Sequence, residues 1–117
     1  MSKFTVKYWG IAHHYGDAFE IEKGPPDPTN FCLDLRVDVK QPESEAVTNY
    51  QLFVCSPSGL AANFNDIADH IAVYAGGSKR YILGKGVLIL REYDIKLIEE
   101  ATISNIENLV TYAIDLS

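Results

Sequence analysis

Cysteine and long hydrophobic runs are scarce in this sequence, and both shortages narrow the class of protein. Only Cys32 and Cys55 are cysteines among 117 residues, and neither lies in a CxxC motif, which excludes a disulfide scaffold. A bridge between these two residues requires that their strands pair, and in an unexported protein they are usually reduced. No apolar run approaches the roughly 18 residues that span a bilayer. The first residues also lack the layout of a signal peptide. We therefore expect a soluble, cytoplasmic protein without a membrane partner.

Basic charge is scarce as well. The chain has 10 Lys and Arg against 16 Asp and Glu, a formal net charge of -6. This sign argues against direct binding to nucleic acid through its phosphates. Part of the acidic surplus lies in residues 17–45, with eight acidic and three basic residues, and part in residues 92–117. Such a surface either only keeps the protein soluble or steers a basic protein partner towards it.

Motifs for catalysis and for metal or nucleotide binding are missing too. His13 and His14 are adjacent, so on a strand they point to opposite faces, and no further ligand follows at metal-site spacing. The glycines around Lys85 do not form a phosphate-binding loop. Cys55 closes an apolar strand, where a cysteine usually behaves as a small hydrophobe. We expect no catalytic residue, no metal site and no cofactor.

The patterns that are present predict a sheet. Residues 31–39 alternate strictly between apolar and polar side chains, which is typical of an antiparallel strand covered on one face. Further strands are predicted at residues 3–11, 50–55 and 81–91. A solvated hairpin loop is predicted between the strands at 31–39 and 50–55.

The helix signals are local. Ser56 and Pro57 form a helix N-terminus, and Asp94 can cap a helix over the following residues. Residues 65–74 allow a helical turn or two, and residues 106–114 carry a helical apolar stripe after a capping box. We predict one α+β domain over residues 1–117, a mostly antiparallel sheet of about four strands with two or three helices packed on one face.

Surface composition suggests where a protein partner would bind. Trp9 is predicted on the polar side of its strand, opposite Phe4, Val6 and Tyr8. The combination of a tryptophan with arginine and carboxylates on an open sheet is typical of a binding hot spot. The candidate contact residues on the sheet are Trp9, Asp34, Arg36 and Asp38, and further acidic candidates are Glu43, Glu45, Asp66 and Asp69.

Several short motifs also occur in a recognisable order. Asn30 and Phe31 open the alternating strand, a Val-Cys-Ser-Pro segment with Cys55 and Pro57 closes the next one, and a Leu-Gly-Lys and an Arg-Glu-Tyr-Asp segment follow. Over most of its length the chain thereby resembles the immunity protein 8 family of bacterial polymorphic toxin and contact-dependent growth inhibition systems. The matching residues read as fold determinants: Asn30, Phe31, Cys55, Pro57, Gly84 and Tyr93.

The resemblance implies a protein that is not an enzyme. It implies binding to a cognate toxin domain, which the bound protein neutralises. Such toxins are often nucleases with basic substrate-binding surfaces, which fits an acidic inhibitor.

Two alternatives from other classes stay open on the sequence alone. One is a small cytosolic α+β enzyme or ligand-binding domain with a pocket near Cys55, His13 and Tyr93. The other is a structural subunit that associates with itself through an edge strand.

Overall fold

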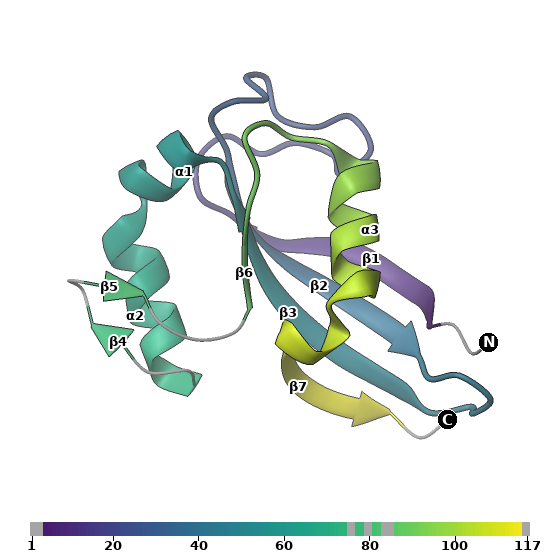
Figure 1. The fold of residues 1–117 in the computed structure, drawn as a ribbon. Helices are drawn as coiled ribbons and strands as arrows, with labels where there is room; N and C mark the ends of the chain where they lie inside the picture. The colour runs from purple at the N-terminus through teal and green to yellow at the C-terminus, as the bar shows by residue number, and fades with distance from the viewer. Residues whose placement is uncertain (1–3, 75–76, 79–80, 83–85, 116–117) are drawn as a thin grey trace.

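The computed structural model describes residues 4–74, 77–78, 81–82 and 86–115, of which 70–74, 77–78, 81–82 and 112–115 by their backbone alone. Its main sheet contains five strands in the order β1-β2-β3-β6, with β7 also paired to β3 (Figure 1). These strands are β1 (Thr5–His14), β2 (Cys32–Lys40), β3 (Val47–Cys55), β6 (Val87–Ile89) and β7 (Val110–Asp115).

One edge of β3 is shared by two short strands. The Phe53–Cys55 end pairs in parallel with β6, and the Val47–Gln51 end pairs antiparallel with β7. Gly86 stands where the pairing changes: its N–H donates to the Asn108 carbonyl at 2.9 Å, and its carbonyl accepts from Phe53 N–H at 2.8 Å. Its φ of +84° favours glycine, and a Cβ there would lie 2.6 Å from Val110 Cγ2.

Two of the helices begin after the caps that the sequence predicts, Ser56 and Asp94. The helix α1 (Pro57–Ala62) starts after Ser56, whose Oγ accepts from Gly59 N–H at 3.1 Å. It is followed by α2 (Phe64–Tyr74), the small hairpin of β4 (Gly77–Ser78) and β5 (Tyr81–Ile82), α3 (Ile95–Ser104) and the 3₁₀ turn η1 (Ile106–Asn108). The α+β class with a mostly antiparallel sheet is therefore confirmed.

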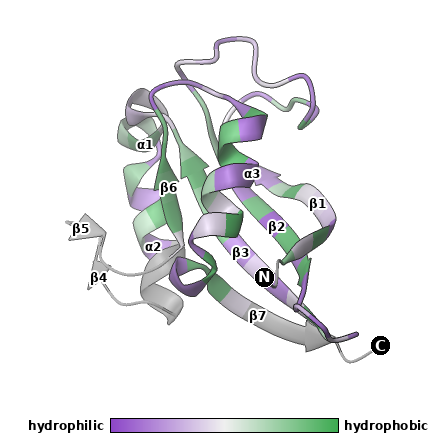
Figure 2. Cartoon of the chain, turned by 45° about the vertical axis from the view of Figure 1, so that its right-hand side comes forward, coloured by the Kyte–Doolittle hydropathy of each residue, from purple (hydrophilic) through white to green (hydrophobic). Residues whose placement is uncertain are grey.

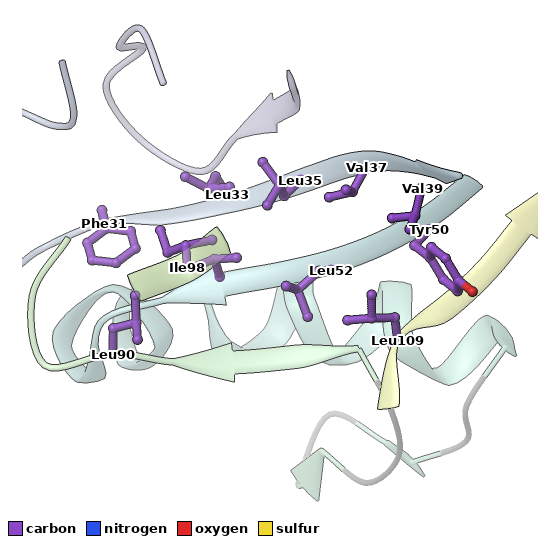
Figure 3. Packing of buried hydrophobic residues seen from close by; sticks show 11 residues of the cluster. Phe31, Leu33, Leu35, Val37, Val39, Tyr50, Leu52, Leu90, Ile98 and Leu109 are labelled. Atoms are coloured by element: carbon purple, nitrogen blue, oxygen red, sulfur yellow. The ribbon is translucent and has the colours of Figure 1, made fainter. Parts of the chain in front are cut away.

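The helices differ from the prediction in lying on both faces of the sheet. Ile98 of α3 packs on a large apolar cluster on one face (Figure 3). Ile67 of α2 packs against Phe53 and the two cysteines, which alternate onto the other face. In Figure 1, α1 and α2 accordingly lie to the left of β6 and α3 to its right. The larger cluster contains Phe31, Leu33, Leu35, Val37, Val39, Tyr50, Leu52, Val54, Leu90, Ile98 and Leu109.

The predicted helix over residues 106–114 is wrong. Only Ile106–Asn108 form a helical turn, and Val110–Asp115 form β7. The cap and the apolar stripe are local signals, whereas the open edge of β3 is a tertiary feature that a strand rich in β-branched residues can pair with. The predicted strand over residues 81–91 is represented by β5 and β6, and residues 83–85 lie outside the described residues.

Candidate functional site

A hydrogen-bonded polar surface covers the part of β1, β2 and β3 that faces away from α3. Along β2, hydrophilic residues alternate with hydrophobic ones (Figure 2). Residues directly opposite each other on paired strands share a face of the sheet. Asp38 therefore lies between Asn49 of β3 and Tyr8 of β1, and Arg36 lies between Gln51 of β3 and Gly10 of β1. We call this surface the polar sheet face; its members are Tyr8, Gly10, Asp34, Arg36, Asp38, Asn49 and Gln51.

The carboxylates of the polar sheet face already have partners inside the chain. Arg36 Nε and Nη2 donate to the two Asp34 oxygens, both at 3.3 Å, and Gln51 Nε2 donates to Asp34 Oδ2 at 3.0 Å. Asn49 Nδ2 donates to Asp38 Oδ1. Asp34 is only 7% exposed. The predicted contact residues Asp34, Arg36 and Asp38 are thus brought together, but Arg36 balances the charge of Asp34 and the Asn49 amide holds the Asp38 carboxylate.

Trp9 does not lie on this surface, which corrects the prediction. A bulge inserts Lys7, so that Val6 pairs with Val39 but Trp9 pairs with Val37. A one-residue shift moves a side chain to the other face. The Trp9 ring therefore packs partly buried against the apolar cluster under α3. Its indole Nε1 is buried and has no hydrogen-bond partner among the described residues.

Tyr8 takes the position predicted for the tryptophan. It pairs with Asp38, lies on the polar sheet face and is 57% exposed. Its ring lies over Gly10, where a Cβ would come within 2.8 Å of the ring carbon Cζ. Sequence reasoning missed Tyr8 because the alternation in residues 3–11 shows no break at the bulge.

The remaining predicted acidic residues do not join one patch. Glu43 and Glu45 are exposed in the loop between β2 and β3, at the sheet end away from α1. Asp66 and Asp69 are exposed on α2, which covers the Cys55 end. These two pairs are separated by the length of β3.

A second group of carboxylates comes from the two acidic segments of the sequence, residues 17–45 and 92–117, although none of its members was among the candidate contact residues. The loop between β1 and β2 lies beside the start of α3 (Figure 1). Tyr93 connects the two segments. The Tyr93 hydroxyl donates to the Ile21 carbonyl at 2.6 Å, and Tyr93 N–H donates to the Pro28 carbonyl at 2.7 Å. The ring makes edge contacts with Phe19 and Phe31 at centroid distances of 5.5 and 5.2 Å. Burial, with the Glu22 carboxylate as a second cause, raises the pKa of Tyr93 to about 12.

These contacts hold exposed acidic residues from the loop beside those of α3. Asp94 Oδ1 caps α3 by accepting from Lys96 and Leu97 N–H at 3.1 and 3.2 Å. Leu97 is 44% exposed on this helix. Within the described ranges, the only ion pair in this group is the exposed one between Glu20 and Lys23. We call this group the acidic surface; its members are Glu20, Glu22, Glu92, Asp94, Glu99 and Glu100, all exposed.

The residues named for an enzyme pocket are not brought together. Cys55 is fully buried beneath α2, and Tyr93 lies on the opposite side of the sheet. His13 is exposed, and its ring makes an edge contact with Tyr15 at 4.6 Å. A cavity of about 230 Å³ lies under the loop between β1 and β2, but none of Cys55, His13 and Tyr93 lines it. Among the residues with a described position, no three His, Cys, Asp or Glu are grouped to hold a metal ion.

Four of the residues carried by the family resemblance, Asn30, Phe31, Cys55 and Pro57, lie at or beside the corner between β3 and α1, whereas Tyr93 lies at the start of α3. Phe31 N–H donates to Ser56 Oγ, and Ser56 N–H donates to the Phe31 carbonyl, both at 3.0 Å. A Cβ at Gly59 would overlap the Phe31 carbonyl. Pro57 occupies the first turn of α1 and Asn30 precedes Phe31. Gly84 lies outside the described residues.

One of the three comparisons with known proteins identifies a family. In the part of the chain that the structure covers, no helix has the length and apolar character needed to cross a membrane. Neither the curated proteins nor the solved structures contain a significant match. A family model described as immunity protein 8 matches residues 12–113, nearly the whole chain. The chain therefore belongs to the immunity protein 8 family, the immunity proteins of a toxin system.

Proposed function

We propose that this chain neutralises one cognate toxin by binding directly to it in the cytoplasm, without catalysis of its own. The match to the immunity protein 8 family over residues 12–113 carries this proposal. The toxin belongs to a contact-dependent growth inhibition or related polymorphic system, and the immunity protein acts stoichiometrically by blocking the active site or the path of the substrate.

The toxin is a nuclease with a basic substrate-binding surface. The net charge of -6 supports this, because a protein that resembles nucleic acid in charge competes for the same surface. Charge complementarity accelerates encounter and fixes the orientation of the partners. The chain itself does not bind nucleic acid, since the same negative charge repels phosphates.

The acidic surface is the part that faces the toxin. Its exposed carboxylates are free to meet lysine and arginine side chains, whereas those of Asp34 and Asp38 would first have to give up internal hydrogen bonds. Leu97 supplies an exposed apolar contact beside Glu100 on α3. The alternative contact surface is the polar sheet face. It contains the earlier candidates Asp34, Arg36 and Asp38, with Tyr8 in place of Trp9.

The cavity under the loop between β1 and β2 offers a place for one basic side chain of the toxin. Its lining combines the carboxylates of Asp17 and Asp27 with the rings of Tyr15, Phe19 and Phe31. An aromatic wall with nearby carboxylates is suited to a lysine or arginine head group. The two hydrogen bonds from Thr29 lower the pKa of Asp27, which keeps this carboxylate charged.

Calorimetry with the toxin domain encoded beside this chain tests the function. Titration at two salt concentrations should give tight 1:1 binding that weakens as salt rises. In a nuclease assay, activity should disappear at one equivalent of the immunity protein. Absence of both binding and inhibition would overturn the proposal, and tight binding that is indifferent to salt would keep the function but refute the acidic surface.

A further inference from the structure

We propose that Cys32 and Cys55 form a redox-sensitive pair that closes to a disulfide across β2 and β3. This inference concerns the stability of the fold and is independent of the toxin. Both residues are buried, at 2% and 0% exposure, and they are free thiols in the structure. They line up directly opposite each other on neighbouring antiparallel strands.

The hydrogen bonds around the pair identify the type of cross-strand position. Ser56 N–H donates to the Phe31 carbonyl, one residue beyond each cysteine. The carbonyls of Cys32 and Cys55 accept from Tyr15 and Leu90 N–H at 2.9 and 2.8 Å. This is the pattern of a non-hydrogen-bonded pair, in which opposite Cα atoms are only about 4.5 Å apart. That separation lies within the range spanned by disulfides.

The sulfur atoms already point at each other. Cys32 Sγ and Cys55 Sγ are 2.8 Å apart, in hydrogen-bond contact. A disulfide joins its sulfur atoms at about 2.05 Å, so a small movement of the side chains completes the geometry. No metal site competes for the thiols, because no third metal-ligating group is near among the described residues. Both cysteines are buried, and Cys32 also lines the cavity under the loop between β1 and β2.

The apolar surroundings protect whichever state the pair is in. Ile67 and Phe53 pack with the two cysteines in a buried cluster under α2. The hydrogen bond that the Cys32 thiol donates to the Cys55 sulfur, followed by burial, raises the pKa of Cys32 far above its usual range. Since the thiolate is the reactive form, the folded dithiol exchanges slowly with external reagents. Closure therefore occurs during folding or during transient opening of the strand end.

The reaction balances with a disulfide oxidant. Oxidised glutathione accepts two electrons and two protons from the thiols; one S–S bond forms in the protein and two glutathione thiols are released. The bridge joins residues 23 positions apart and constrains the unfolded chain. The bridge also restrains the turn from β3 into α1, because Cys55 directly precedes Ser56, the residue that caps α1. The stability of the fold thus follows the thiol–disulfide balance of its surroundings.

The test compares the full chain folded in buffer and unfolded in guanidinium. Each sample is equilibrated with a series of reduced and oxidised glutathione mixtures and read by intact mass. We expect the ratio of disulfide to dithiol to be roughly 100-fold or more higher in the folded chain, because the bridge and the fold stabilise each other. The melting temperature of the oxidised chain should rise by roughly 10 °C.

A matched variant separates bridge formation from other oxidation. Cys32→Ser should take up one glutathione when unfolded, never lose two hydrogen atoms, and show no rise in melting temperature on oxidation. If the folded chain favours the disulfide no more than the unfolded chain does, or if oxidation lowers its melting temperature, the pair is a structural dithiol and the proposal is overturned.

Discussion

The polar sheet face and the acidic surface both carry carboxylates, but they use them in different ways. On the sheet, Asp34 is held by Arg36 and Gln51, and Asp38 is held by Asn49. On the acidic surface, Glu99 and Glu100 are exposed on α3 and belong to no ion pair among the described residues. The first arrangement stabilises the fold, because buried polar groups need partners. The second leaves charge available to a partner, because among the described residues only Glu20 of this surface has an ion-pair partner, Lys23.

Charge reversal on α3 should weaken toxin binding more than any change on the polar sheet face. In the double variant Glu99→Lys with Glu100→Lys, we expect the Kd for the toxin to rise about 100-fold, since attraction becomes repulsion at the contact. Calorimetry measures this effect. The matched control, Glu43→Lys with Glu45→Lys, changes the net charge equally in the exposed β2–β3 loop and should shift the Kd less than about threefold. Equal losses in both variants would mean that only the net charge matters.

Asp34→Ala should damage the fold and spare recognition. The substitution leaves Gln51, which is 9% exposed, without its acceptor and removes both contacts of Arg36 with the carboxylate. We expect the free energy of unfolding in urea to fall by about 2 kcal/mol, with an unchanged association rate. Glu100→Ala is the matched control and should change stability by less than about 0.5 kcal/mol. A slower association in Asp34→Ala would assign the sheet carboxylate to the contact.

Tyr93→Phe tests the junction between the loop and α3. The variant keeps the ring contacts but loses the hydrogen bond to the Ile21 carbonyl, which should cost about 1 kcal/mol of unfolding free energy.

The contribution of Tyr93 to stability should fall as the pH rises above about 10. The folded pKa of Tyr93 is raised from 10.0 to about 12, so its contribution to stability is complete below about pH 10 and is lost as the pH rises towards 12. Urea unfolding at pH values on either side of this window should therefore show a smaller loss of stability in Tyr93→Phe than in the natural sequence. An equal loss in both proteins would contradict the shifted pKa.

Tyr8→Ala should have the smallest effect. Because this ring is 57% exposed, its removal should change the unfolding free energy by less than about 0.5 kcal/mol. We also expect less than a twofold change in the Kd for the toxin. A loss of tenfold or more would identify Tyr8 as a binding hot spot and move the contact to the polar sheet face.

The parts of the fold that the sequence predicts are those set by local chemistry. Alternation places β2, and Ser56 and Asp94 cap α1 and α3, because each signal acts within a few residues. The sequence does not predict features that depend on contacts between segments far apart in the chain. The bulge at Lys7 exchanges Tyr8 and Trp9 between the faces, and pairing with β3 turns the predicted last helix into β7.

The same limit applies to the candidate site. Asp34, Arg36 and Asp38 are predicted together because they alternate along one strand. The acidic surface is not predicted, because Tyr93 joins a loop and a helix that are 72 residues apart in sequence. The net charge of the chain gives the sign of the partner but not the place of contact.

Chemical labelling of carboxylates, with and without bound toxin, tests the central claim most directly. Carbodiimide coupling of glycine ethyl ester, read residue by residue by mass spectrometry, reports which acidic side chains the toxin covers. We predict that toxin binding protects Glu22, Glu99 and Glu100 and leaves the labelling of Glu43 and Glu45 unchanged. Protection of Asp38, Glu43 or Glu45 with full labelling of α3 would contradict the account.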